Sequence, residues 1–150
     1  MLIHFQHTEL VVVSPQQLFA VLTDYQAYPA SNPKVVSAAV IGQHGNQVEV
    51  QTQRRTLIGK HARFTDTYAP TPLLQFVRRY AGHETAISTW TVEPAFGGQA
   101  YFTITAEMTV PFVQGILLYP ILKRMFYPLN FPPFIRAAQR SGKHETLQAS

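Results

Sequence analysis

The sequence predicts a single α+β domain, residues 1–150, in which a curved antiparallel sheet holds one long C-terminal helix. Up to about residue 110, short runs of alternating apolar and polar residues are separated by turns rich in Gly and Pro, as in antiparallel strands. Beyond that point apolar residues recur at helical spacing, as at Val113, Leu117 and Ile121. The chain is long enough to bury a core of its own.

The first strand and the helices after it follow from local signals. Residues 3–13 alternate apolar and polar side chains, which indicates a strand. Ser14-Pro15 predicts the start of a short helix over residues 15–22, because Ser caps helix N-termini and Pro suits the first helical position. We expect Asp24 to cap a second short helix through Tyr25 and Tyr28, which Pro29 and Pro33 then end.

Six further strands complete the predicted sheet, over residues 35–41, 47–53, 60–68, 74–81, 86–93 and 99–110. We expect turns or breaks between them at residues 42–46, 57–59, 70–72, 82 and 97–98. Consecutive strands joined by short turns pair antiparallel, so seven strands form one antiparallel sheet. The terminal helix is the candidate cover for one face of this sheet.

The C-terminal stretch, residues 111–138, is apolar on nearly all faces of a helix, so we expect it to be buried on several sides, to face lipid or to meet a partner. Four prolines interrupt it: Pro120, Pro128, Pro132 and Pro133. A proline inside a helix costs about 3 kcal/mol. We therefore expect a helix to about residue 127, kinked near Gly115 or Pro120, then a break and a separate helix over residues 132–141.

Charge is scarce and unevenly spread. Charged residues make up 13% of the chain and there is no Cys, which excludes disulfides and thiolate metal sites. The positive and negative residues of 1–111 balance, so the whole net charge of +4 lies in residues 112–150. An apolar and basic segment predicts contact of residues 112–140 with a membrane surface, or a homodimer contact; the alternative is a solvated outer helix face. Without a signal peptide, we expect a cytoplasmic protein.

Several short motifs resemble the START-like (SRPBCC) superfamily, and within it the polyketide cyclase/dehydrase and lipid-transport group. They are Val13-Ser14-Pro15, Leu18-Phe19, Leu22-Thr23-Asp24-Tyr25, Tyr28-Pro29, Asn32-Pro33, Ser88-Thr89-Trp90, Glu93-Pro94 and Gly97-Gly98. The resemblance implies a helix-grip fold, in which the sheet curls round the C-terminal helix and leaves a cavity between them. Its members bind sterols, lipids, quinones, polyketides and plant hormones, and share no catalytic residue.

In such a fold the inward side chains of the strands form both the core and the ligand wall. We expect an apolar pocket of about 300 Å³ or more between sheet and helix. The side chains expected to line it are Phe64, Asp66, Tyr68, Phe76, Arg78, Tyr80, Trp90, Phe102 and Met108 from the strands, and Leu118, Leu122 and Met125 from the helix.

Arg78 is the candidate polar anchor of this pocket. It shares the strand phase of Phe76 and Tyr80, while Arg79 points to the other face. If that face is concave, Arg78 pairs with Asp66 or Glu107, or holds a carboxylate or phosphate of the ligand. If the apolar phase shifts along the strand, Arg78 is solvated instead.

Three functions stay open at this point. The first is binding or transport of a small hydrophobic ligand, such as a lipid, a quinone or a polyketide-like ring system, without a cofactor. The second is a cyclase, aromatase or dehydratase, for which Asp66, His61, His83, Tyr68, Tyr80 and Arg78 supply residue types but no diagnostic spacing. The third is a protein or membrane interaction module. The six His show no metal-ligand spacing, and a charge-balanced body argues against nucleic acid.

Overall fold

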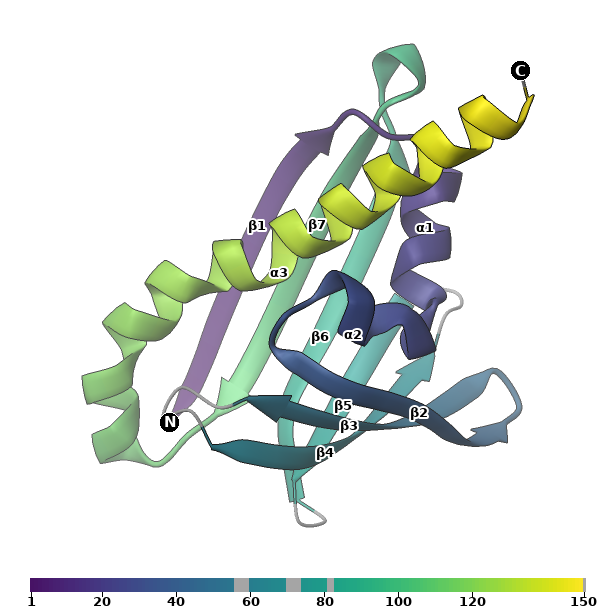
Figure 1. The fold of residues 1–150 in the computed structure, drawn as a ribbon. Helices are drawn as coiled ribbons and strands as arrows, with labels where there is room; N and C mark the ends of the chain where they lie inside the picture. Colours follow the sequence, from purple (N-terminus) through teal and green to yellow (C-terminus); the bar gives the residue numbers. More distant parts are fainter. Residues whose placement is uncertain (56–59, 70–73, 81–82, 150) are drawn as a thin grey trace.

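The computed structural model of the chain describes residues 1–55, 60–69, 74–80 and 83–149 (Figure 1). The turns predicted at residues 57–59, 70–72 and 82 lie outside these described residues. In chain order the elements are β1 (Leu2–Val11), α1 (Pro15–Thr23), η1 (Tyr25–Ala27), α2 (Tyr28–Ser31), β2 (Val35–His44), β3 (Gln47–Arg55), β4 (His61–Ala69), β5 (Leu74–Tyr80), β6 (His83–Pro94), η2 (Phe96–Gly98), β7 (Ala100–Thr109) and α3 (Phe112–Ala149).

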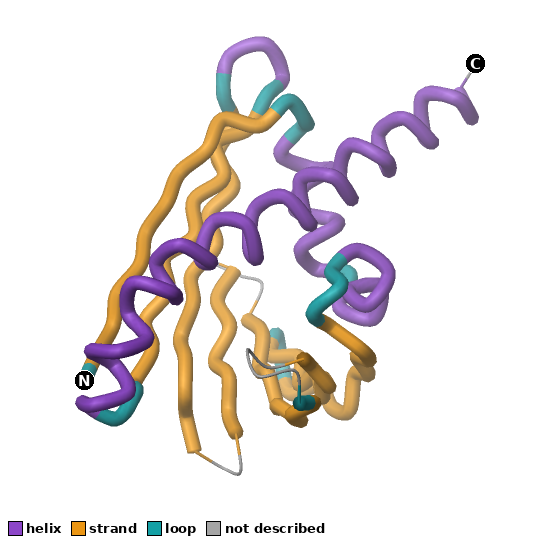
Figure 2. Tube along the Cα trace, turned by 60° about the vertical axis from the view of Figure 1, so that its left-hand side comes forward, coloured by secondary structure: helices purple, strands orange, loops and turns teal. Residues whose placement is uncertain are grey.

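The strands form one seven-stranded sheet in the order β1-β7-β6-β5-β4-β3-β2, with every pairing antiparallel. The helix α3 runs across one face of this sheet, and α1 and α2 pack beside it (Figures 1 and 2). The predicted α+β class, with two short helical pieces after the first strand and a long helix at the end, is therefore confirmed. The strand β2 is longer than predicted and continues to His44, so the turn shrinks to Gly45 and Asn46.

The helix α1 begins where the sequence predicts. Gln17 N donates to Ser14 Oγ at 3.1 Å, and Ser14 N donates to Gln17 Oε1 at 3.3 Å, which completes a capping box. Asp24 stands at the predicted N-cap position of η1, but its side chain makes no capping hydrogen bond. Pro33 follows the end of α2 as predicted, whereas Pro29 does not end a helix. It stands in the first turn of α2, where its missing N–H has no partner to lose.

The helix α3 is continuous from Phe112 to Ala149, with all four prolines inside it. The predicted break after residue 127 and the separate helix over residues 132–141 are therefore wrong. A proline removes one backbone hydrogen bond, but tertiary packing supplies most of the stability of a helix in a protein. Phe131 and Ala138 of α3 are fully buried against the rest of the protein. The packing of this face of the helix therefore offsets the free-energy cost of the prolines.

The core lies between the concave face of the sheet, the short helices and the second half of α3. Its members include Leu18 and Leu22 of α1, Trp90 of β6, Phe102 of β7 and Phe131 of α3. On β1, Ile3, Phe5 and Val11 are buried while the even positions are exposed, as the alternation predicts. Within the described ranges, no helix has the length and apolar character needed to cross a membrane.

Candidate functional site

Three charged side chains meet on the concave face of the sheet: Arg54 of β3, Asp66 of β4 and Arg78 of β5. Arg78 Nε and Nη2 donate to the two carboxylate oxygens of Asp66, each at 2.8 Å. Arg54 Nη2 lies farther away, at 3.6 Å from Asp66 Oδ2. The Asp66 side chain is completely buried, whereas 17% of the Arg54 side chain and 20% of the Arg78 side chain reach solvent. The cluster thus holds two cations and one anion.

The strand register explains how the three residues meet. Asp66 and Arg78 are directly opposite each other on β4 and β5. A register shift between Arg78 and Arg79 in the β5–β6 pairing leaves Thr85 as an extra residue, and Thr85 Oγ1 donates to the Arg78 carbonyl at 3.2 Å. Arg54 follows the buried Thr52 at strand spacing, so it faces the same side, and its Nε donates to Thr52 Oγ1 at 3.4 Å.

The two arginines differ in how well Asp66 satisfies them. Burial, and then repulsion from Arg78, lowers the pKa of Arg54 to about 10. Burial acts in the same direction on Arg78, but attraction and hydrogen bonding from Asp66 outweigh it, and the pKa of Arg78 lies above its ordinary value. Arg78 also lies over the ring of Phe64, at 5.2 Å from the ring centroid. The charged form of Arg54 therefore lowers the stability of the folded state, whereas that of Arg78 does not.

Tyrosines cover the cluster on the side of the short helices. The Tyr25 and Tyr68 rings stack at 4.2 Å, and Tyr28 meets Tyr68 edge-on at 6.3 Å. The Tyr28 hydroxyl donates to the Leu22 carbonyl. Burial is the main cause that raises the pKa of both Tyr28 and Tyr68. These phenols are therefore neutral at physiological pH and act as hydrogen-bonding groups beside the arginines.

Beyond the tyrosines, α3 closes the concave face with aromatic rings. Trp90 packs on Phe134 with ring centroids 5.2 Å apart, and Phe102 packs on Phe131 at 5.0 Å. Trp90 Nε1 donates to Ser88 Oγ at 2.8 Å, and Ser88 Oγ donates to the Thr105 carbonyl at 3.1 Å. This end of the face is a packed core with its polar atoms paired.

The residues that the sequence places in the pocket fall into two groups. Asp66, Tyr68, Trp90 and Phe102 are buried. Tyr80 is exposed, and its ring packs on that of Phe64 with the centroids 5.6 Å apart. The remaining residues whose side chains are described are half-buried. The half-buried group is Phe64, Arg78, Met108, Leu118, Leu122 and Met125. Phe76 pairs with Tyr68 and Ser88 in the sheet, and its side chain lies outside the description.

Sequence reasoning placed Tyr68 in the site but missed Arg54, the tyrosines Tyr25 and Tyr28, and the rings of Phe131 and Phe134. A signal for Arg54 exists, because Val48, Val50, Thr52 and Arg54 share one strand phase. The predicted opposite orientation of Arg78 and Arg79 is confirmed. Arg79 Nη1 donates to Thr67 Oγ1 at 3.2 Å on the convex face, away from Asp66.

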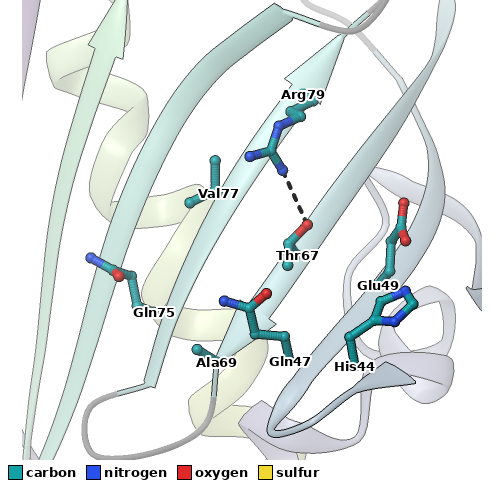
Figure 3. A pocket seen from close by; sticks show the side chains of 8 residues that line it. All are labelled: His44, Gln47, Glu49, Thr67, Ala69, Gln75, Val77 and Arg79. Carbon is teal, nitrogen blue, oxygen red and sulfur yellow. Dashed lines mark hydrogen bonds between the residues drawn. The ribbon is translucent and has the colours of Figure 1, made fainter. Parts of the chain in front are cut away.

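That convex face carries an open hollow of about 420 Å³ lined by β3, β4, β5 and the end of β2 (Figure 3). Its side chains come from the outward positions of these strands, and they mix polar and apolar types without a converging polar group. The lining residues are His44, Gln47, Glu49, Thr67, Ala69, Gln75, Val77 and Arg79. A binding site usually contains a few converging polar groups, and the cluster of Arg54, Asp66 and Arg78 on the concave face supplies such groups.

Comparison with known proteins identifies the family and supports the fold. Residues 3–128 match the family described as polyketide cyclase / dehydrase and lipid transport. No curated protein sequence matches the chain.

Solved structures of low sequence identity share the fold. The Zhui aromatase/cyclase from Streptomyces sp. R1128 is 14% identical, with a TM-score of 0.75 over 93% of this chain and 95% of that one. A START superfamily protein from Mycobacterium smegmatis is 14% identical, with a TM-score of 0.68 over 96% and 98%. Truncated norcoclaurine synthase from Thalictrum flavum is 12% identical, with a TM-score of 0.70 over 91% and 92%.

Proposed function

We propose that this chain, which belongs to the polyketide cyclase / dehydrase and lipid transport family, binds a small hydrophobic ligand that carries an anionic group. The observation that carries the proposal is the charge imbalance on the concave face. Two arginines share the single carboxylate of Asp66, and the polar contacts of Arg54 are long, at 3.6 Å to Asp66 and 3.4 Å to Thr52. A carboxylate, phosphate or enolate of the ligand would complete the coordination of Arg54.

The half-buried side chains supply a wall for the hydrophobic body of this ligand. Leu118, Leu122 and Met125 lie on α3, and Phe64 and Met108 lie on inward positions of β4 and β7. Inward side chains that solvent still reaches differ from the fully buried Tyr68, Trp90 and Phe102. This contrast supports a ligand that enters where α3 begins and places its polar end at the arginines. Binding would then remove apolar surface from water, at about 25 cal/mol per Å².

Asp66 orients the arginines in this proposal and does not act as a base. Its two oxygens accept charged hydrogen bonds from Arg78, and it is the one carboxylate among the buried residues that are described. A carboxylate held in this way keeps the guanidinium of Arg78 in a fixed orientation. Arg78 therefore supports the site, and Arg54 is the residue that we expect to contact the ligand.

A cyclase or dehydratase is the second candidate, and the neutral tyrosines favour it. Arg54 and the phenol of Tyr68 are groups of the kind that stabilises an enolate when a proton leaves the carbon next to a carbonyl, whereas the Tyr28 hydroxyl already donates to Leu22. Such a reaction also needs a proton acceptor of suitable pKa. Asp66 is engaged by two arginines, so we place binding before catalysis.

Two fluorescent probes of matched shape test the proposal. Anilinonaphthalene sulfonate and phenylnaphthylamine share the same aromatic body, and only the first is an anion. We expect the purified protein to bind the sulfonate about tenfold or more tighter than the neutral amine, which is the worth of one hydrogen bond to a charged group. Arg54→Met should remove that preference and leave the affinity for the amine within about twofold.

Arg63→Met is the matched control, because it makes the same change at an exposed position of β4. It should preserve the preference for the sulfonate. If Arg54→Met binds the sulfonate as tightly as the unmodified protein, Arg54 is not the anion-binding residue. If neither probe binds the unmodified protein, the hydrophobic site itself is rejected.

A further inference from the structure

The first turns of α3 expose an apolar surface that the fold leaves uncovered. Its members, called the α3 tip below, are Phe112, Val113, Ile116, Leu117 and Ile121, and their exposed fractions run from 47% at Ile121 to 69% at Val113 and Leu117. Contiguous exposed apolar side chains of this size on a soluble domain mark a contact site more often than chance exposure does.

The opposite face of the same turns is anchored to the sheet. A side-chain carbon at Gly115 would lie 2.9 Å from Met1 Sδ and 3.0 Å from Val110 Cγ2, so glycine allows the helix to approach β1 and the end of β7 closely. Farther along, Phe5 of β1 stacks on Tyr119 at 5.9 Å and on Phe126 at 5.2 Å. The α3 tip therefore projects outward from a helix that is already fixed, and docking through it needs no rearrangement.

A pair of basic residues continues the same helical face. Lys123 follows Ile116 by seven residues and Arg124 follows Leu117 by seven, which is about two turns or 10 Å along the helix. Both are exposed. Between residues 108 and 144 the sequence contains no Asp or Glu, so no acidic side chain of α3 itself neutralises this pair. The face is thus apolar at its start and cationic two turns later.

The α3 tip lies at one end of the molecule, where β1 begins and β7 ends, and away from α1 and α2 (Figure 1). Leu2 of β1, which is 65% exposed and pairs with Thr109, adds apolar surface at this end. Phe96 is fully exposed and lies in the turn between β6 and β7, which is at the start of β7 and so at the opposite end of this strand from the α3 tip. The two ends can therefore be tested against each other.

We propose that the α3 tip docks peripherally on an anionic lipid bilayer, with its apolar side chains inserted below the headgroups and Lys123 and Arg124 at the level of the phosphates. Charge selects this occupant. A symmetric dimer through the same face would offer the basic pair only another copy of an apolar and basic face, with no Asp or Glu between residues 108 and 144 to pair it. An anionic bilayer instead offers hydrocarbon to the tip and negative charge to the pair.

Docking in this orientation places the half-buried side chains Leu118, Leu122 and Met125 close to the lipid, because they lie on the same turns of α3. That consequence alone rests on the proposed function, since it provides a route for a hydrophobic ligand between the bilayer and the concave face. The docking itself stands on the exposed face and its charge, and it is measured without any ligand.

Flotation with vesicles tests the proposal, using phosphatidylcholine alone and phosphatidylcholine mixed with phosphatidylserine. We expect binding to the anionic vesicles and much weaker binding to the neutral ones. A basic residue near such a surface is worth about fivefold in partitioning, so Lys123→Glu/Arg124→Glu should reduce binding by about 25-fold or more. Leu117→Ser should also reduce it, without any change in net charge.

Arg136→Glu/Arg140→Glu is the matched control, because both residues are exposed on the same helix and the change in net charge is identical. It should reduce binding by about threefold at most. Equal losses in the two double variants would reduce the effect to net charge and reject the docking surface. The docking surface would also be rejected if the protein did not bind anionic vesicles, or if it sedimented as a dimer that Leu117→Ser dissociates.

A tryptophan scan locates the inserted end. Leu117→Trp should shift its emission to the blue on anionic vesicles and be quenched by brominated lipid, while Phe96→Trp should show neither effect. Trp90 is buried and supplies a constant background in both variants. A blue shift at position 96 without one at position 117 would place the contact at the other end of the hairpin and overturn the proposal. Probe binding by Arg54→Met, measured without vesicles, decides the proposed function separately.

Discussion

Removing the charge of Arg54 should stabilise the protein in the absence of ligand. Burial, and then repulsion from Arg78, lowers the pKa of Arg54 by more than two units, to about 10. Since one pK unit corresponds to about 1.4 kcal/mol, keeping this group charged at neutral pH costs the folded state about 3 kcal/mol. The cost is present in full below the folded-state pKa and is relieved as the pH rises towards the unfolded value. Because solvent reaches 17% of the side chain, we expect Arg54→Met to raise the free energy of unfolding by about 1 to 3 kcal/mol.

Arg78→Met is the matched perturbation and should have the opposite sign. It removes both 2.8 Å hydrogen bonds to Asp66 and leaves that buried carboxylate with Arg54 at 3.6 Å. Breaking a buried ion pair by removing one partner costs about 3 to 5 kcal/mol. Urea unfolding at neutral pH, followed by the fluorescence of Trp90, measures both variants. If Arg54→Met destabilises the protein as much as Arg78→Met does, Arg54 is part of the structural ion pair and the reasoning about a ligand-binding cation fails.

Three further perturbations test separate parts of the structure. Burial raises the pKa of Tyr68 above its ordinary value of 10, so the neutral phenol stabilises the fold in full below pH 10 and this contribution is lost as the pH rises further. When the pH is raised through 10, the urea midpoint of Tyr68→Phe should therefore fall less than that of the unmodified protein. Ser14→Ala should lower the free energy of unfolding by about 1 kcal/mol in thermal melts, because it removes the capping box of α1, and an unchanged melting temperature would contradict this. Phe131→Ala should cost about 3 to 5 kcal/mol in urea unfolding, whereas Phe96→Ala should stay within about 0.5 kcal/mol; similar effects would mean that the second half of α3 does not hold the core.

Much of the fold follows from short-range patterns. Alternation along β1 and the Ser14-Pro15 signal located the first elements, because side-chain phase and helix capping depend on neighbours within a few residues. The ion pair of Asp66 and Arg78 was among the alternatives for the same reason. Both residues share the phase of their aromatic neighbours, and antiparallel pairing then brings them opposite each other.

The parts that sequence reasoning missed depend on long-range packing. The local cost of proline predicted a broken helix, but Phe131 and Phe134 bury their rings on Phe102 and Trp90, and this packing keeps α3 continuous. In the sequence, Arg54 is one of two adjacent basic residues, and nothing local separates it from Arg55. Its contact with Asp66 needs the register of β3 against β4, in which Asp66 faces Val50 and Arg54 reaches along its own strand towards it. A sequence pattern contains the phase of Arg54 but not that register.

Native mass spectrometry of protein purified without detergent tests the central claim most directly. We predict that the unmodified protein and Arg63→Met carry a co-purified hydrophobic acid as a discrete mass adduct, and that Arg54→Met has lost it while remaining folded. An adduct retained in full by Arg54→Met, or protein that is bare in every variant and takes up no anionic probe, would contradict the account of a hydrophobic ligand anchored at Arg54.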